Sequence, residues 1–149
     1  MDVYRVTLFG HRDFCPTKNI EEELTSILKK LMLSERYLEI YIGRNGEFDI
    51  FVATVVKRLQ KTMGKDNCAM ILVLPYAVKD VGYYEKYYDD IIIPECVANI
   101  PPKAAITARN RWMLDESDLL ICCVQRNSGG AYKAMKYAER IGLETIRIN

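Results

Sequence analysis

One stretch decides the fold of this chain: Asp118-Leu119-Leu120-Ile121-Cys122-Cys123-Val124-Gln125-Arg126-Asn127-Ser128-Gly129-Gly130-Ala131. An apolar run of strand length meets a glycine turn, and a helix-like segment, 132–140, follows at once. A strand that ends at a glycine pair and continues as a helix leaves backbone N–H groups free at the helix start. These amides and the positive end of the helix dipole favour a phosphate or another anion. The stretch therefore predicts an α/β fold with an anion site at Ser128, Gly129 and Gly130.

Length and composition limit the class of protein. The chain has 149 residues, half of them hydrophobic, and a net charge of +1. This predicts one domain, residues 1–149, with a substantial core, and argues against disorder and against a generally basic, nucleic-acid-binding surface. The N-terminus shows no apolar signal core, and no apolar run approaches the roughly 20 residues that span a bilayer. We expect a cytoplasmic protein without membrane contact.

Several familiar sites are not indicated by the sequence. The five cysteines lack CxxC spacing and His11 is the single histidine, so a Cys/His zinc site is not expected. Cys68, Cys122 and Cys123 lie in apolar strand-like runs, where buried thiols are common. The GxGxxG fingerprint and the P-loop GxxxxGK(S/T) are both missing from the sequence. This disfavours ordinary dinucleotide oxidoreductases and P-loop hydrolases, and no cofactor is predicted.

Strand-like runs and helical stripes alternate along the whole chain. Strands are expected at 3–9, 37–42, 68–74, 91–93, 118–124 and 143–148, and helices from about residues 20, 48, 103 and 130 onward. Asn19 and Glu22 are expected to form a capping box on the first helix, and Gly142 to cap the last. The alternation predicts a single-domain, Rossmann-like α/β fold: a doubly wound, mainly parallel sheet with helices on both faces.

A second glycine loop, Gly10-His11-Arg12, follows the first expected strand. His11 suits hydrogen bonding or proton exchange near neutral pH, and Arg12 suits a phosphate or carboxylate. The alternative is a tight turn whose side chains cap a helix or pair with Asp13.

A third loop, Gly43-Arg44-Asn45-Gly46-Glu47-Phe48-Asp49, opens the second helix. Arg44 and Asn45 offer donors, and Asp49 suits ribose hydroxyls. The alternative is an Asn-Gly turn followed by first-turn acids, which we prefer for Glu47. Ligands on doubly wound sheets lie beyond the carboxyl ends of the strands. We therefore expect the three loops to line one pocket.

Arg109-Asn110-Arg111-Trp112-Met113 lies on the expected helix before the penultimate strand. Helical spacing places Arg109 and Arg111 on different faces, with Met113 packing inward. Arginines beside a tryptophan are compatible with nucleic-acid binding, but no wider basic run accompanies them. The tyrosine-rich segment 76–88 is open to three interpretations: a wall of the site, a helix or a dimer contact.

Together these segments resemble the SLOG superfamily, which unites Lonely Guy-type proteins, the Rossmann-like domain of DNA-processing protein A and YpsA-like proteins. The small YpsA-like group is the nearest likeness. The resemblance rests on the order of Phe9-Gly10-His11-Arg12, Gly43-Arg44-Asn45-Gly46-Glu47-Phe48-Asp49, Leu74-Pro75-Tyr76, Arg109-Asn110-Arg111-Trp112-Met113 and Ser128-Gly129-Gly130-Ala131. It implies a Rossmann-like sheet whose glycine loops bind a nucleotide or a nucleotide-derived molecule.

The resemblance to Lonely Guy enzymes is incomplete at one catalytic position. Those enzymes cleave the N-glycosidic bond of nucleoside monophosphates, and pair an arginine in Arg-Lys-x-x-Met with a glutamate after Gly-Gly-x-Gly-Thr. Arg109 and Met113 match the first segment, but Ala134 stands at the glutamate position. A carboxylate stabilises oxocarbenium character or helps water attack, and alanine does neither. Glu95 and Asp49 are the candidates for a spatial substitute.

The leading hypothesis is a nucleotide-binding domain that acts as a sensor or regulatory module. Its expected binding residues are Gly10, His11, Arg12, Gly43, Arg44, Asn45, Gly46, Asp49, Arg109, Ser128, Gly129 and Gly130. The first alternative is a phosphoribohydrolase that cleaves a nucleoside monophosphate, with Arg109 as the best catalytic candidate. The second is a DNA- or protein-interaction module. We expect the protein to form a homo-oligomer.

Overall fold

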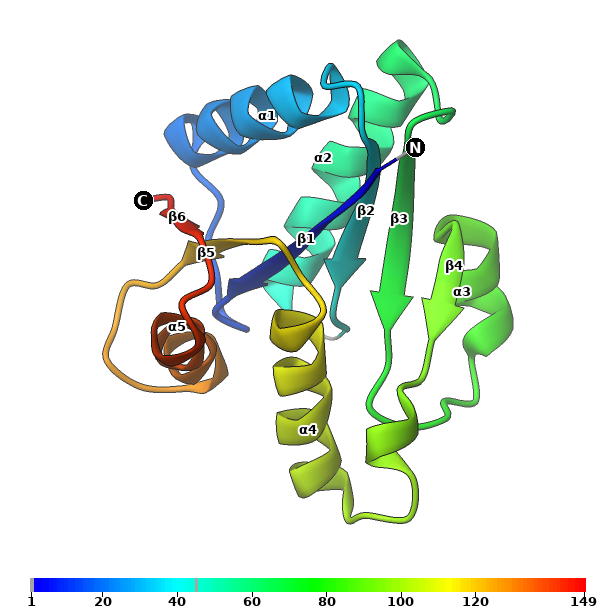
Figure 1. Ribbon diagram of the computed structural model, residues 1–149, viewed down its shortest axis with the longest axis vertical. Helices are drawn as coiled ribbons and strands as arrows, with labels where there is room; N and C mark the ends of the chain where they lie inside the picture. The colour runs from blue at the N-terminus through cyan, green and yellow to red at the C-terminus, as the bar shows by residue number, and fades with distance from the viewer. Residues whose placement is uncertain (1, 45) are drawn as a thin grey trace.

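The computed structural model describes residues 2–44 and 46–149, in which strands and helices alternate (Figure 1). In chain order the elements are β1 (Val3–Gly10), α1 (Lys18–Met32), β2 (Tyr37–Ile42), α2 (Glu47–Met63), β3 (Cys68–Val73), α3 (Val81–Tyr87), β4 (Asp90–Ile92), the short 3-10 helix η1 (Glu95–Val97), α4 (Pro102–Asp115), β5 (Leu119–Cys123), α5 (Gly130–Ile141) and β6 (Thr145–Arg147).

The strands form one sheet in the order β4-β3-β2-β1-β5-β6, and every neighbouring pair is parallel. The predicted Rossmann-like, doubly wound fold is therefore confirmed. The chain builds outward from β1 to β4 and then returns through α4 to place β5 on the other side of β1. The order of the strands reverses between β1 and β5, and ligands bind beside such a switch point in open α/β sheets. The loops after these two strands are the predicted glycine loops.

Helices cover both faces of the sheet, as β5 illustrates. Leu119, Ile121 and Cys123 join the core formed with α1 and α2. Leu120 and Cys122 face the opposite way and pack with α5. Successive side chains of a strand point to opposite faces, so a strand covered on both sides is apolar at every position. The continuous apolar run of β5 has this cause.

The predicted burial of the strand cysteines is confirmed. Cys68, Cys122 and Cys123 are buried as free thiols, whereas Cys15 and Cys96 are exposed free thiols. Burial raises the pKa of Cys68 to about 12 and that of Cys122 to about 11. The buried thiols are therefore protonated core side chains, not nucleophiles.

One predicted helix cap is wrong and another is confirmed. The N-cap of α1 is Thr17, whose Oγ1 accepts a hydrogen bond from the Ile20 N–H at 3.2 Å. Asn19 already lies inside the helix, so it does not form the predicted capping box with Glu22. Gly142 ends α5 in the left-handed conformation, with φ 72° and ψ 26°, as predicted.

Candidate functional site

The N-terminus of α5 is open. Its N-cap is Gly129, with φ 89°, and no side chain caps the helix. This φ lies in the region that glycine adopts most readily. A Cβ added to Gly129 or Gly130 would meet no atom within 4 Å, so the space beside these residues is empty. Uncapped first-turn amides and the helix dipole make this end suitable for an anion.

At the N-terminus of α2 the N-cap is again a glycine, Gly46, without a side-chain cap, but the first helical amide has a partner. The Glu47 N–H donates to the Arg12 carbonyl at 2.9 Å. The Asp49 carboxylate accepts a hydrogen bond from the Gly46 N–H, which is half of a capping box. These contacts agree with the alternative interpretation of this loop, in which acids in the first turn stabilise the start of the helix. Asn45, predicted to bind ligand, lies outside the described residues.

The glycine loops surround one cavity of about 360 Å³. Most of the predicted binding residues line it: Gly10, His11, Arg12, Gly43, Arg44, Asp49, Arg109, Gly129 and Gly130. Gly46 does not line the cavity but packs against a lining residue, since an added Cβ would be 3.3 Å from Asp49 Oδ2. Ser128 is exposed and is not part of the lining. The structure therefore brings together residues from the three predicted loops and from α4, without Ser128.

Further lining residues did not figure among the predicted binding residues. They are Phe9, Pro75, Tyr76, Ile106, Asn110, Arg126 and Ala131. Phe9, Asn110 and Ala131 each adjoin a predicted residue, and Pro75 and Tyr76 belong to a segment that carries the family resemblance. The membership of these residues in such segments was the sequence signal that could have predicted them as lining residues. Arg126 lies in the loop after β5, at the carboxyl edge of the sheet.

Packing alone explains why residue 10 is glycine. An added Cβ would lie 2.1 Å from Cγ of Phe48, a ring that is almost completely buried. Phe48 in turn contacts Phe14 edge to face, with ring centroids 5.1 Å apart. Gly10 lines the cavity, but its missing side chain makes room for the core.

Arg109 is the buried cation of the cavity, with 7% of its surface exposed. Its Nη1 donates to the Val73 carbonyl at 2.8 Å, and its Nε donates to Asn110 Oδ1 at 2.8 Å. Gly43 packs beside it, since an added Cβ would be 3.4 Å from Nη1. Nη2 makes no hydrogen bond within the described part of the chain. The prediction that Arg109 and Arg111 lie on different faces is confirmed, because Arg111 is exposed.

Asp49 is the carboxylate nearest to this guanidinium in the cavity wall. Burial raises the pKa of Asp49 to about 6, although the Arg109 charge and the Gly46 N–H act in the opposite direction. Burial in turn lowers the pKa of Arg109, and Asp49 opposes that change. A carboxyl group with this pKa accepts hydrogen bonds when ionised and donates one when protonated, both near neutral pH.

His11 does not have the predicted freedom to exchange protons near pH 7. Its ring is 6% exposed, and its Nε2 accepts a hydrogen bond from the Gln125 N–H at 3.0 Å. Burial and the nearby Arg126 lower its pKa. The imidazole is therefore neutral at pH 7, and Nδ1 carries its proton. This hydrogen bond ties the loop after β1 to the loop after β5.

The remaining arginines of the cavity differ in their partners. Arg126 pairs with both carboxylate oxygens of Asp13, at 2.9 and 3.2 Å. Asp13 thus pairs across the switch point and not with its neighbour Arg12, which is exposed. Arg44 lies by Tyr84, with Nη1 3.4 Å from the phenol oxygen.

Ala134 lies on the buried face of α5, 4% exposed, and packs into the core on that side of the sheet. It therefore adds no polar group where the Lonely Guy pattern has glutamate. Of the two candidate substitutes, Asp49 lines the cavity and Glu95 does not. Within the described chain, no group of three histidine, cysteine or acidic side chains is arranged to hold a metal ion.

The architecture is similar to that of a known protein. The X-ray structure of DNA processing protein A (DprA) from Streptococcus pneumoniae superposes with a TM-score of 0.66 and 17% sequence identity. The fold is Rossmann-like. The superposition covers 98% of this chain and 50% of that protein, so this chain spans about half its length. At this identity the similarity establishes the fold alone.

No protein-family model and no curated protein sequence matches the chain. The predicted likeness to the Rossmann-like domain of DNA-processing protein A is confirmed at the level of the fold. Placement in the SLOG superfamily and its YpsA-like group stays a prediction. The expected cytoplasmic location and homo-oligomer also stay predictions. None of the helices described is long and apolar enough to cross a membrane.

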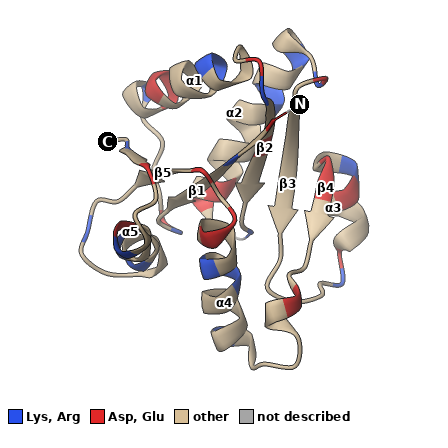
Figure 2. Cartoon of the chain, viewed as in Figure 1, with Lys and Arg blue, Asp and Glu red and all other residues tan. Residues whose placement is uncertain are grey.

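A larger groove, of about 680 Å³, runs between α4 and α5. It meets the first cavity at Ile106, Asn110 and Gly130, which line both. Its other walls are side chains of the two helices, including Leu114 and Tyr137, and it receives no strand-end loop. Figure 2 shows acidic and basic residues on both helices. The 360 Å³ cavity, at the carboxyl edge of the sheet, is therefore the better candidate for the ligand site.

Proposed function

We propose that this protein binds a nucleotide or nucleotide-derived ligand in the 360 Å³ cavity, with a phosphate at the N-terminus of α5. The observation that carries the proposal is the buried Arg109 guanidinium in a cavity that also contains Gly129 and Gly130. Val73 and Asn110 accept hydrogen bonds from two nitrogens of this guanidinium, Nη2 has no hydrogen-bond partner within the described part of the chain, and planar arginine donors match a phosphate. The volume lies near the lower end of small-molecule sites, which span on the order of 300–1,000 Å³.

The polar groups beside Arg109 suit the rest of a nucleotide. Asp49 is an acceptor for sugar hydroxyls when ionised, and Arg44 supplies a second positive charge to the wall. The neutral His11 offers one ring N–H. The lining combines these polar and charged side chains with the apolar Phe9, Pro75 and Ile106, and convergent polar groups of this kind bind and orient small molecules. A binding module of this kind fits a sensor or regulatory role.

The test measures nucleotide binding at the end of α5. AMP, GMP, CMP, UMP, ADP-ribose and NAD are each titrated by calorimetry, with thermal shift as a second measure. Gly130→Ala introduces a Cβ into the empty space beside the helix start and should weaken binding without loss of stability.

Gly82→Ala is the matched control, because Gly82 also faces open space and lines no described cavity. It should bind as the unaltered protein does. The proposal is overturned if none of the nucleotides binds. If Gly130→Ala and the unaltered protein bind the nucleotides with equal affinity, the proposed position of the phosphate at the α5 N-terminus is wrong.

A second candidate function is cleavage of an N-glycosidic bond. It is favoured by the position of Asp49 in the same cavity wall as Arg109, where the raised pKa keeps the carboxyl group near its titration point. Water would attack C1′ as the bond to the base breaks, and the Asp49 carboxylate would take the proton from water and pass it to the departing base. Incubation with nucleoside monophosphates should then release free base, and Asp49→Asn should abolish the release. Nucleotide binding without base release supports a binding module only.

A further inference from the structure

A second cavity, of about 300 Å³, adjoins the first. Its walls come from the end of β2, from α2 and from α3: Gly43, Arg44, Asp49, Ile50, Ala53, Tyr83, Tyr84, Tyr87 and Tyr88. Gly43, Arg44 and Asp49 line both cavities, so the two spaces lie against the same three residues. The sequence left the role of the tyrosine-rich segment open, and the structure makes it a cavity wall.

The tyrosines at α3 form an aromatic surface: Tyr87 and Tyr88 pack against the main core, whereas Tyr83 and Tyr84 do not belong to it. Their rings lie in a chain, with centroid distances of 5.4 Å for Tyr83–Tyr84, 6.2 Å for Tyr84–Tyr88 and 5.4 Å for Tyr87–Tyr88. No residue of α3 is buried, and Tyr83 is 70% exposed. Aromatic rings present large apolar faces, so a grouped and accessible set favours a flat apolar partner.

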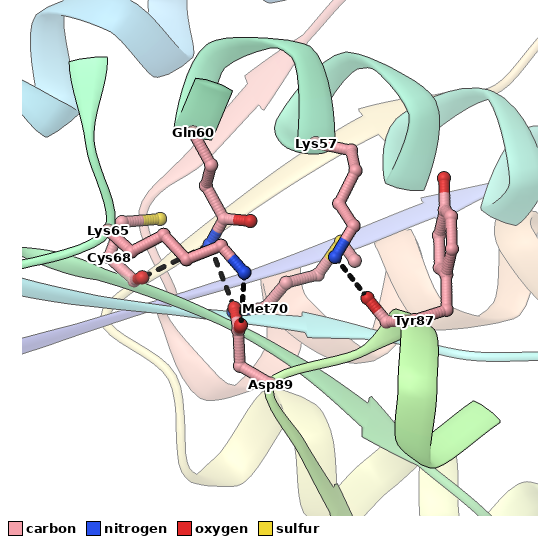
Figure 3. A network of polar contacts seen from close by, with 7 residues as sticks. All are labelled: Lys57, Gln60, Lys65, Cys68, Met70, Tyr87 and Asp89. Atoms are coloured by element: carbon pink, nitrogen blue, oxygen red, sulfur yellow. Dashed lines mark hydrogen bonds and ion pairs between the residues drawn. The ribbon is translucent and has the colours of Figure 1, made fainter. Parts of the chain in front are cut away.

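Polar contacts hold α3 and its exit in place (Figure 3). Lys57 Nζ on α2 donates to the Tyr87 carbonyl at 2.6 Å. Asp89 accepts hydrogen bonds from the Met70 N–H at 2.7 Å and from Gln60 Nε2 at 2.8 Å. These contacts join the end of α3 to α2 and β3 through groups other than the tyrosine rings. The aromatic wall is therefore formed before any ligand arrives, which reduces the ordering that binding requires.

Arg44 stands where the two cavities meet. Its guanidinium carbon lies 5.9 Å from the centre of the Tyr84 ring, and its Nη1 is 3.4 Å from the Tyr84 phenol oxygen. A ligand that reaches from one cavity into the other therefore meets Arg44 and Asp49, which line both. Sugar hydroxyls and phosphate oxygens suit this junction, whereas an aromatic ring suits the tyrosines.

From this arrangement we propose that the tyrosine cavity is a subsite for the base of the ligand whose phosphate binds at α5. The inference rests on the proposed function and extends it, because it assigns the ligand a phosphate at one end and an aromatic ring at the other. Stacking on tyrosine tolerates different bases, since every base has a π face. The subsite therefore contributes affinity for nucleotides over sugar phosphates more than choice among bases.

The experiment compares ligands with and without a base. AMP, GMP, CMP and UMP are titrated by calorimetry beside ribose 5-phosphate, which has the same sugar and phosphate. Tyr84→Leu should lower the affinity for the nucleotides by about tenfold, the size expected for loss of one stacking contact, and leave ribose 5-phosphate unchanged. Tyr83→Ala, at a mostly exposed residue, repeats the test where folding is not at risk.

Tyr4→Leu is the matched control. Tyr4 also lies against an arginine, with Arg36 3.8 Å from its ring centre, but lines none of the described cavities. It should leave all affinities unchanged.

The outcomes separate the two proposals. If nucleotides and ribose 5-phosphate bind equally and the Tyr83 and Tyr84 variants change neither, the base subsite is overturned while the phosphate site stands. If Gly130→Ala is without effect but Tyr84→Leu weakens nucleotide binding, the phosphate position is overturned and the aromatic subsite stands. If neither class of ligand binds, both proposals fail.

Discussion

Asp49→Asn should make the protein more stable at high pH, because it removes a carboxylate from a place where ionisation is unfavourable. Asn keeps the size of the side chain and an oxygen that accepts the Gly46 N–H. It cannot ionise, so it resembles the protonated carboxyl group at every pH. Burial is the main cause of the raised pKa, and the Arg109 charge offsets it only in part.

The size of the effect follows from the pKa of Asp49 in the two states. The value is about 6 in the folded protein and 3.8 for the reference carboxyl group. Between these values the folded state binds more protons than the unfolded state. The free energy of unfolding therefore falls as pH rises through this window and stays lower above it. The full difference is about 3 kcal/mol at pH 8, and less than about 1 kcal/mol remains at pH 4.

Urea unfolding of the two proteins at pH 4 and pH 8 measures this difference. The stability of Asp49→Asn relative to the unaltered protein should increase by about 2 kcal/mol between the two pH values. Glu47→Gln is the matched control: Glu47 is an exposed acid in the same helical turn, and its substitution should show no such increase. If the relative stability of Asp49→Asn is the same at both pH values, the reasoning about burial of Asp49 is refuted.

Three further substitutions test the fold by urea unfolding. Gly10→Ala should lower the free energy of unfolding by about 1–3 kcal/mol, because its Cβ meets the Phe48 ring. The same substitution should cost less stability in a Phe48→Leu background, and an unchanged urea midpoint for Gly10→Ala would contradict this packing. Thr17→Ala should lower stability by about 1 kcal/mol through loss of the α1 cap, and no change would restore the rival capping box. Gly142→Ala should lower it by about 1 kcal/mol because φ is 72°, whereas a gain in stability would argue against the left-handed cap.

The fold was predictable because its signals are local and repeated. The apolar runs that form β3 and β5 have the length and continuity expected of a strand covered on both faces. The alternation of such runs with helical stripes allows few topologies once connections are short and right-handed. The misplaced cap of α1 shows the limit of local signals. Thr17 and Asn19 are both good N-cap residues, and only the backbone conformation decides between them.

The candidate site was predictable in outline for a similar reason. Parallel strands bring their carboxyl ends to one edge, so loops that are distant in sequence, such as those at Gly10 and Gly129, become neighbours. Which of the loops is free to bind an anion was not predictable. At the start of α2 the Glu47 N–H is paired with the Arg12 carbonyl and the Gly46 N–H with Asp49, pairings that the glycines present at both helix starts do not reveal.

The sequence by itself determined the order of strands and helices outside the tyrosine-rich segment that contains α3, the sheet edge at which the loops meet and the residues available there, because these depend on periodicity and chain connectivity. Only the tertiary structure decided the chemical state and surroundings of those residues. It placed the half-buried Asp49 near Arg109, turned His11 Nε2 toward the Gln125 N–H and arranged the tyrosines of 83–88 around a cavity. These properties depend on desolvation and on hydrogen-bond partners far away in the chain, which no local pattern of residues records.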